Sequence, residues 1–139
     1  MPHETYACIR ISGDAIALAA GARYQILVAS WPAGAPGHFL SRLDELNTAY
    51  PLKHVAMANR RCKGRAMWQE ALSEWCERHG IALEILDDRR TVSELARGRG
   101  LLAEARARGI QVQDELEAAA VAMLDFQLRR AALADVVAA

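Results

Sequence analysis

Residues 81–126 read IALEILDDRRTVSELARGRGLLAEARARGIQVQDELEAAAVAMLDF, and this stretch decides the fold. Ile81–Leu86 predicts the last strand of a sheet. Thr91–Arg108 has helical periodicity interrupted by two glycines, and a largely apolar helix is predicted from Asp114 to about Val137. A strand followed by helices is typical of a sheet whose faces are covered by helices.

The residues upstream predict three strands, a helix, a further strand and a second helix. We place these elements, in order, at Tyr6–Ser12, Ala15–Ala20, Tyr24–Trp31, His38–Ala49, His54–Ala58 and Arg65–His79. The first three strands predict an antiparallel meander. Strands that alternate with helices after it predict a mixed α/β fold, with two parallel strands beside the meander and one domain over residues 1–139.

The composition is that of a globular protein with a sizeable core. Hydrophobic residues make up 53% of the 139 residues and charged residues 24%. The longest apolar runs, such as Ala118–Leu124, are too short to span a bilayer, and Met1–Arg10 lacks the pattern of a secretory signal. We therefore expect a cytoplasmic protein without a membrane partner. The three cysteines include no Cys-x-x-Cys pair and are expected to be small core residues.

Positive charge is concentrated in two blocks, although the net charge is zero. Five cationic residues and no acid occur from Lys53 to Arg65, and six arginines occur from Arg89 to Arg108. Two such blocks suit a local phosphate-binding face, and ordinary solvated surface is the alternative. The candidate phosphate contacts are Arg60, Arg61, Lys63, Arg65, Arg89, Arg90, Arg97 and Arg99.

The second basic block carries a resemblance to a known family. It resembles the segment R-T-V-K-K-x-x-x-G-x-G of the RuvC-type Holliday-junction resolvases at Arg90, Thr91, Val92, Gly98 and Gly100. Residues 114–125, DELEAAAVAMLD, are similar to D-D-x-E-A-D-A-x-A-L-x-D in phage-type relatives, and residues 54–59 resemble the family's V-V-A-x-E strand. The resemblance covers most of the chain. It implies an RNase H-like fold, a homodimer, and cleavage of branched DNA by two Mg²⁺ ions that carboxylates hold.

Most of the family's metal ligands are replaced in this chain. The Asp of the first strand corresponds to Ser12 or Arg10, depending on the length of the turn, the Glu of the central strand to Ala58, and the inner Asp of the last helix to Ala119. Mg²⁺ requires near-octahedral oxygen coordination, which alanine cannot provide. We therefore expect no metal at Ser12, Ala58 and Ala119, and a catalytically degenerate homologue that binds DNA.

An active Mg²⁺-dependent crossover-junction endodeoxyribonuclease is the alternative. It would need Asp14, Asp88, Asp114 and Glu117 to converge as unconventional ligands. Each acid also has a structural interpretation: Asp14 lies in a turn, Asp88 ends a strand beside arginines, and Asp114 and Glu117 have the spacing of a capping box.

The two tryptophans of the second predicted helix raise a third possibility. Trp68 and Trp75 are seven residues apart and therefore share a helix face. Packing into the core is the default interpretation, and an interface in a homodimer or with a protein partner is its competitor. A protein-interaction or dimerisation module without nucleic acid is thus the third candidate function.

Overall fold

The computed structural model describes residues 5–12, 15–22, 25–32, 34, 36–59, 62–86 and 100–138. Within them the elements, in chain order, are β1 (Thr5–Ile11), β2 (Ala15–Ala22), β3 (Gln25–Pro32), α1 (Pro36–Ala49), β4 (Leu52–Ala58), α2 (Arg65–Arg78), β5 (Ala82–Leu86), α4 (Leu101–Ala107) and α5 (Glu115–Ala138). No helix in these ranges is long and apolar enough to cross a membrane.

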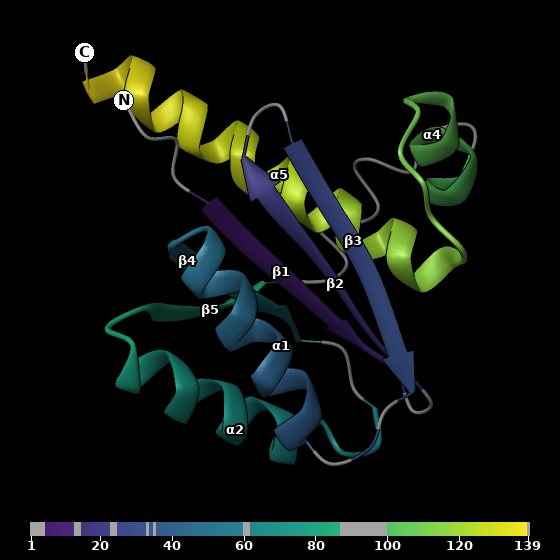
Figure 1. Ribbon diagram of the computed structural model, residues 1–139. Helices are drawn as coiled ribbons and strands as arrows, with labels where there is room; N and C mark the ends of the chain where they lie inside the picture. The colour runs from purple at the N-terminus through teal and green to yellow at the C-terminus, as the bar shows by residue number, and fades with distance from the viewer. Residues whose placement is uncertain are drawn as a thin grey trace.

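The strands form one mixed sheet in the order β3-β2-β1-β4-β5. β1, β2 and β3 make an antiparallel meander, whereas β4 pairs parallel to β1 and β5 parallel to β4. Helices cover both faces: α1 and α2 lie on one side of the sheet, and α5 crosses the other (Figure 1). The α/β fold predicted from the sequence is therefore confirmed.

β1 lies at the centre of the sheet and is buried on both faces. Ala7, Ile9 and Ile11 belong to the core under α1 and α2, while Tyr6 and Cys8 belong to the core under α5. A strand covered on both sides has to be apolar at almost every position, which explains the near-continuous hydrophobic sequence of this segment.

The face under α1 and α2 is packed with large aromatic side chains. Phe39 makes edge-on contacts with Trp31 and Trp68, with ring centroids 5.4 and 5.5 Å apart. Trp68 is only 2% exposed and Trp75 only 1%. The prediction that these two tryptophans form a contact surface is therefore wrong, because both side chains are enclosed between α2 and the sheet.

The face under α5 is lined instead by small side chains. Its buried alanines are Ala17, Ala19, Ala56, Ala58, Ala105, Ala118 and Ala120. Residues 117–124 of α5 are all buried, so this helix has almost no polar face over its first half. Small residues on both partners let the helix axis approach the strands closely.

Most elements begin or end one or two residues from their predicted bounds. β4 begins at Leu52 rather than His54, because the side chain of Asn47 accepts a hydrogen bond from the Leu52 N–H (2.8 Å) and the Leu52 side chain is buried. Of the helix predicted at Thr91–Arg108, the structure describes α4 at Leu101–Ala107, while residues 91–99 lie outside the described ranges.

Candidate nucleic-acid interface at the carboxyl ends of the parallel strands

One row of residues crosses the sheet near the carboxyl ends of β1, β4 and β5. It consists of Ser30, Ala17, Arg10, Ala58 and Leu86. Ser30 pairs with Ala17, Ala17 with Arg10, and Ala58 with Leu86, and the residues preceding Arg10 and Ala58 pair with each other. Sites in open α/β sheets commonly lie at this edge, beyond the carboxyl ends of the strands.

Arg10 is a buried cation near the middle of this row. Its side chain is on the α5 side of β1, since it alternates with Ile9 and Ile11, and the residue is 6% exposed. Ser12, by contrast, closes the turn to β2: its hydroxyl accepts a hydrogen bond from the Ala15 N–H at 3.2 Å. Arg10 and Ser12 are the two positions at which the resemblance places the aspartate of the first strand, and neither residue carries a carboxylate.

The two alanines at the other ligand positions provide no oxygen side chain. Ala58 and Ala119 are both buried, and Ala58 packs in the core under α5. Among the residues that the structure describes, no group of three His, Cys, Asp or Glu side chains could hold a metal ion. The described residues therefore do not fit a Mg²⁺ site. Asp14 and Asp88, which the active alternative requires, lie outside the described ranges.

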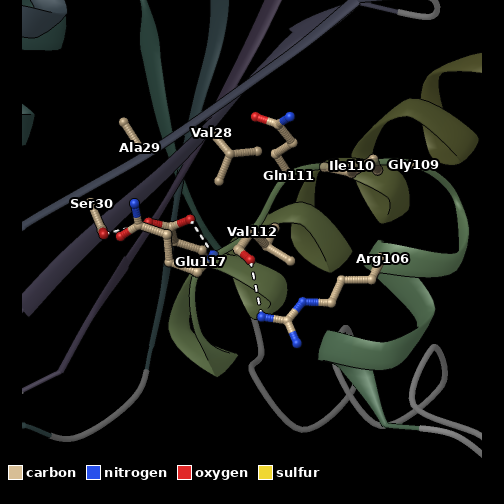
Figure 2. Close-up of a pocket in the computed structure, with 10 residues that line it drawn as sticks. Val28, Ala29, Ser30, Arg106, Gly109, Ile110, Gln111, Val112 and Glu117 are labelled. Carbon is tan, nitrogen blue, oxygen red and sulfur yellow. Dashed lines mark hydrogen bonds between the residues drawn. The ribbon is translucent and has the colours of Figure 1, made fainter.

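Asp114 and Glu117 hold the first turn of α5. The Glu117 N–H donates a hydrogen bond to Asp114 Oδ1 at 2.9 Å, so Asp114 caps the helix as predicted. The Glu117 carboxylate accepts hydrogen bonds from the Ser30 hydroxyl on β3 and from the Gln113 N–H at 3.0 Å (Figure 2). In a capping box this carboxylate would bind the N–H of the cap itself. Here it binds the preceding N–H and ties α5 to β3.

Cys8 lies in the core under α5 and carries no accessible nucleophile. Burial raises the pKa of its thiol far above the usual value, and the charges of Glu84 and Asp125 raise it further. The thiol therefore stays neutral, and a neutral thiol is neither a nucleophile nor a good metal ligand.

Two candidate phosphate ligands stand at the same edge of the sheet as the row. Lys63 is exposed in the turn that leads into α2, and Arg65 begins that helix with its Nη1 donating to the Asn59 carbonyl at 2.8 Å. The other six are outside the described residues: Arg60, Arg61, Arg89, Arg90, Arg97 and Arg99.

The strands that precede the two basic segments end next to each other. β4 and β5 are parallel neighbours, and the Asn59 N–H donates to the Leu86 carbonyl at 2.9 Å just where the two strands end. In the sequence, residues 59–65 follow the end of β4 and the Arg-rich segment follows Leu86 at the end of β5. Charge and topology together mark this edge as a candidate nucleic-acid interface.

The order of the strands and the helices on both faces define an RNase H-like fold. Among solved structures, the chain is similar to RuvC of T. thermophilus in complex with a Holliday junction substrate, with a TM-score of 0.64, 14% identity, and coverage of 92% of this chain and 96% of that one. A second Thermus thermophilus RuvC structure gives a TM-score of 0.59 at 11% identity, covering 86% and 89%.

YeaZ from Pseudomonas aeruginosa is also similar, with a TM-score of 0.53 and 11% identity over 76% of this chain and 50% of that one. No family model and no curated protein matches the sequence. Identities of this size show a shared fold, and the chain spans nearly the whole length of RuvC within that fold.

Two elements of the site had little signal in the sequence. Arg10 stands alone in the apolar run CIRIS, and its burial follows only from the covering of that strand by α5. Ser30 and Glu117 are 87 residues apart in the chain, and neither belongs to a motif that would predict their hydrogen bond.

Proposed function

We propose that the protein binds branched DNA at the edge where β4 and β5 end, and that it does so without metal-dependent cleavage. The observation that supports the absence of cleavage is the row itself: Ala58 stands at the position that the resemblance gives to a glutamate, and neither Arg10 nor Ser12, the two candidates for the first-strand aspartate, carries a carboxylate. The fold supports the same proposal, because a RuvC structure similar to this chain was solved with a Holliday junction. A phage-type origin, a homodimeric state and a cytoplasmic location are parts of the same proposal.

The physical basis of binding is the arginine and lysine content of the two segments that follow β4 and β5 in the sequence. Lys63 is exposed, and Arg65 is anchored by the Asn59 carbonyl with further guanidinium donors left for a ligand. Contacts of this kind bind phosphate oxygens and position the DNA without reading its sequence. Binding should therefore depend on the shape of the DNA and weaken steeply with added salt.

The active-endonuclease alternative is less well supported. In the described residues Glu117 and Asp114 both have structural roles, since Glu117 joins α5 to Ser30 of β3 and Asp114 caps the helix, and the sequence places alanine at two of the family's ligand positions. The interaction-module alternative loses its proposed surface because Trp68 and Trp75 are buried.

The test is a gel shift of a labelled four-way DNA junction against a linear duplex of equal length. In EDTA the junction should shift at low salt, and in Mg²⁺ or Mn²⁺ it should remain uncut. The double substitution Lys63→Ala with Arg65→Ala should weaken binding by about tenfold and lower the salt dependence by roughly one unit of slope per lost phosphate contact.

Lys53→Ala is the matched control. Lys53 belongs to the same basic block and is exposed, but it lies at the other end of β4, about 17 Å from Ala58 at the rise of a strand. Its loss should change affinity by less than about twofold. Metal-dependent cutting of the junction, no binding at low salt, or equal effects of the two sets of substitutions would each overturn the proposal.

A further inference from the structure

A groove runs along the outer edge of β3 and reaches Ser30, the end residue of the row that crosses the sheet. Two adjoining hollows of about 650 and 610 Å³ lie between this strand and the segment that joins α4 to α5. Both are lined by Val28 and by residues 109–111, so they form one continuous groove from Ile26 to Ser30. Figure 2 shows the hollow at the Ser30 end. At the rise of a strand, the distance from Ile26 to Ser30 is about 13 Å.

The wall of this groove is a sheet edge. Within the described ranges β3 pairs with β2 alone and is the terminal strand of the sheet. Its sequence, QILVASWP, contains no charged residue to discourage pairing. An edge strand exposes main-chain N–H and C=O groups in a regular row, and a second extended segment can satisfy them.

One end of the groove carries a buried negative charge. Glu117 is 3% exposed, and the two hydrogen bonds that hold it come from neutral groups, the Ser30 hydroxyl and the Gln113 N–H. Burial of a carboxylate is costly unless a positive charge compensates it. Each carboxylate oxygen has a second lone pair with which to accept such a donor.

Arg106 lines the same groove but is poorly placed to provide this charge. Its Nη2 donates to the Val112 carbonyl at 3.5 Å, and the residue is exposed to solvent. Water and salt screen the charge of the exposed Arg106 guanidinium, so its attraction to Glu117 is weak. A cation that entered the buried surroundings of Glu117 would interact with the carboxylate more strongly. Arg108, the second cation that lines the groove, is paired with Asp125. A ligand that brings its own positive charge would therefore complement Glu117.

We infer that the groove binds an extended peptide segment of a partner protein, which adds to the sheet beside β3 and places an arginine or lysine side chain against Glu117. The main-chain hydrogen bonds of β3 provide affinity, and every second side chain of the peptide faces the groove. Val28 and Val112 form the apolar part of the groove, so small branched side chains suit the positions on either side of the basic one.

The test uses the full chain and a labelled heptapeptide, TVTRTVT, blocked at both ends, with binding followed by fluorescence anisotropy and by NMR amide shifts. Two matched peptides carry citrulline in place of arginine, or N-methyl groups on alternate amides. The first removes the charge at constant shape, and the second removes main-chain hydrogen bonds. We expect shifts in β3 and residues 109–113, and a loss of about tenfold in affinity with citrulline.

Glu117→Gln provides the second arm. It should abolish the difference between the arginine and citrulline peptides, a result that a general loss of stability would not produce. Glu115→Gln is the matched control, since Glu115 is an exposed acid in the same helical turn, and it should preserve the difference.

Several outcomes would overturn the inference. These are no shift at millimolar peptide, equal binding of the citrulline or N-methylated peptide, and the same shifts with methylguanidine alone, which would indicate a small-molecule site. Shifts in β3 on raising the protein concentration without peptide would assign the groove to a second copy of the chain.

Discussion

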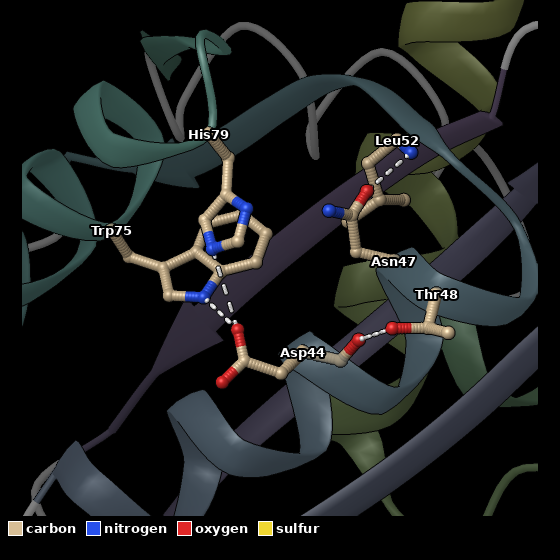
Figure 3. Close-up of polar contacts among 6 residues, drawn as sticks. All are labelled: Asp44, Asn47, Thr48, Leu52, Trp75 and His79. Carbon is tan, nitrogen blue, oxygen red and sulfur yellow. Dashed lines mark hydrogen bonds and ion pairs between the residues drawn. The ribbon is translucent and has the colours of Figure 1, made fainter.

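The indole nitrogen of Trp75 donates a hydrogen bond of 2.7 Å to the carboxylate of Asp44 and so joins α2 to α1 (Figure 3). His79 stacks on the Trp75 ring at a centroid distance of 4.2 Å, and its Nε2 lies 3.4 Å from the same Asp44 oxygen. Trp75 is fully buried, so water reaches its indole N–H poorly. The carboxylate of Asp44 provides the hydrogen-bond acceptor instead.

Asp44→Ala should therefore lower the free energy of unfolding by about 1–3 kcal/mol, because it leaves the buried indole N–H without an acceptor. Asp44→Asn retains an oxygen at the same place and should have a smaller effect. Urea denaturation measures both. Glu45→Ala removes the neighbouring exposed acid and should cost less than about 0.5 kcal/mol. Equal losses at positions 44 and 45 would contradict this role for Asp44.

Asp114 should behave as a helix cap. Asp114→Ala should reduce the free energy of unfolding by about 1 kcal/mol, because the Glu117 N–H loses its acceptor, while Asp114→Asn should remain within a few tenths of the wild type. Thermal or urea unfolding checks this order. If Asp114→Asn instead strongly lowered metal affinity while stability stayed unchanged, Asp114 would be a metal ligand, as the active-enzyme alternative requires.

The three cysteines should differ sharply in reactivity. Burial raises the pKa of Cys76 to about 11 and holds that of Cys8 higher still, whereas Cys62 is only partly buried. At pH 8 a disulfide reagent such as DTNB should thus modify one thiol rapidly in the native protein and three in guanidinium chloride. In Cys62→Ser the rapid phase should disappear. Its persistence would show that one of the other thiols is accessible.

Glu84 should make stability depend on pH in the acidic range. Partial burial raises its pKa, but hydrogen bonds from Arg130 and Gln127, with the charges of Arg130 and His54, outweigh burial, so the pKa lies below the usual 4.5. A carboxyl group with a lowered pKa in the folded state stabilises the fold above the unfolded value, and this contribution is lost as pH falls through the folded pKa.

The stability difference between the wild type and Glu84→Gln should therefore be largest above about pH 5 and shrink below about pH 4.5. Urea unfolding at a series of pH values measures it. Glu70→Gln, at an exposed position on α2, should show no comparable trend. A difference that stays constant down to pH 3 would contradict the role assigned to the Arg130 and Gln127 hydrogen bonds.

The order of strands and helices along the chain was predictable from the sequence because apolar segments and turn signals are local. Tertiary contacts explain what was missed. Leu52 belongs to β4 because its N–H donates a hydrogen bond to the side chain of Asn47. Neither residue, taken by itself, predicts this hydrogen bond or the start of the strand. Helical spacing places Trp68 and Trp75 on one face, but periodicity cannot distinguish a face that meets its own sheet from one that meets another molecule.

The site was predictable in part. Alignment with the resolvase pattern placed alanine at position 58 but left Arg10 and Ser12 as alternatives for the first strand. In the structure Arg10 lies within β1 opposite Ala17, and Ser12 closes the turn to β2. The hydrogen bond between Ser30 and Glu117 depends on where α5 crosses the sheet. Tertiary packing sets that position, and the local sequence does not reveal it.

The alanines beneath α5 restrict which amino-acid substitutions this part of the core can accommodate. A carboxylate introduced at Ala58 would enter a space that α5 fills, because Ala58 packs under this helix in a core of small side chains. A helix residue would have to become smaller, or α5 would have to shift, in the same step. A carboxylate at position 58 would therefore require coordinated substitutions on β4 and α5, each destabilising when made alone.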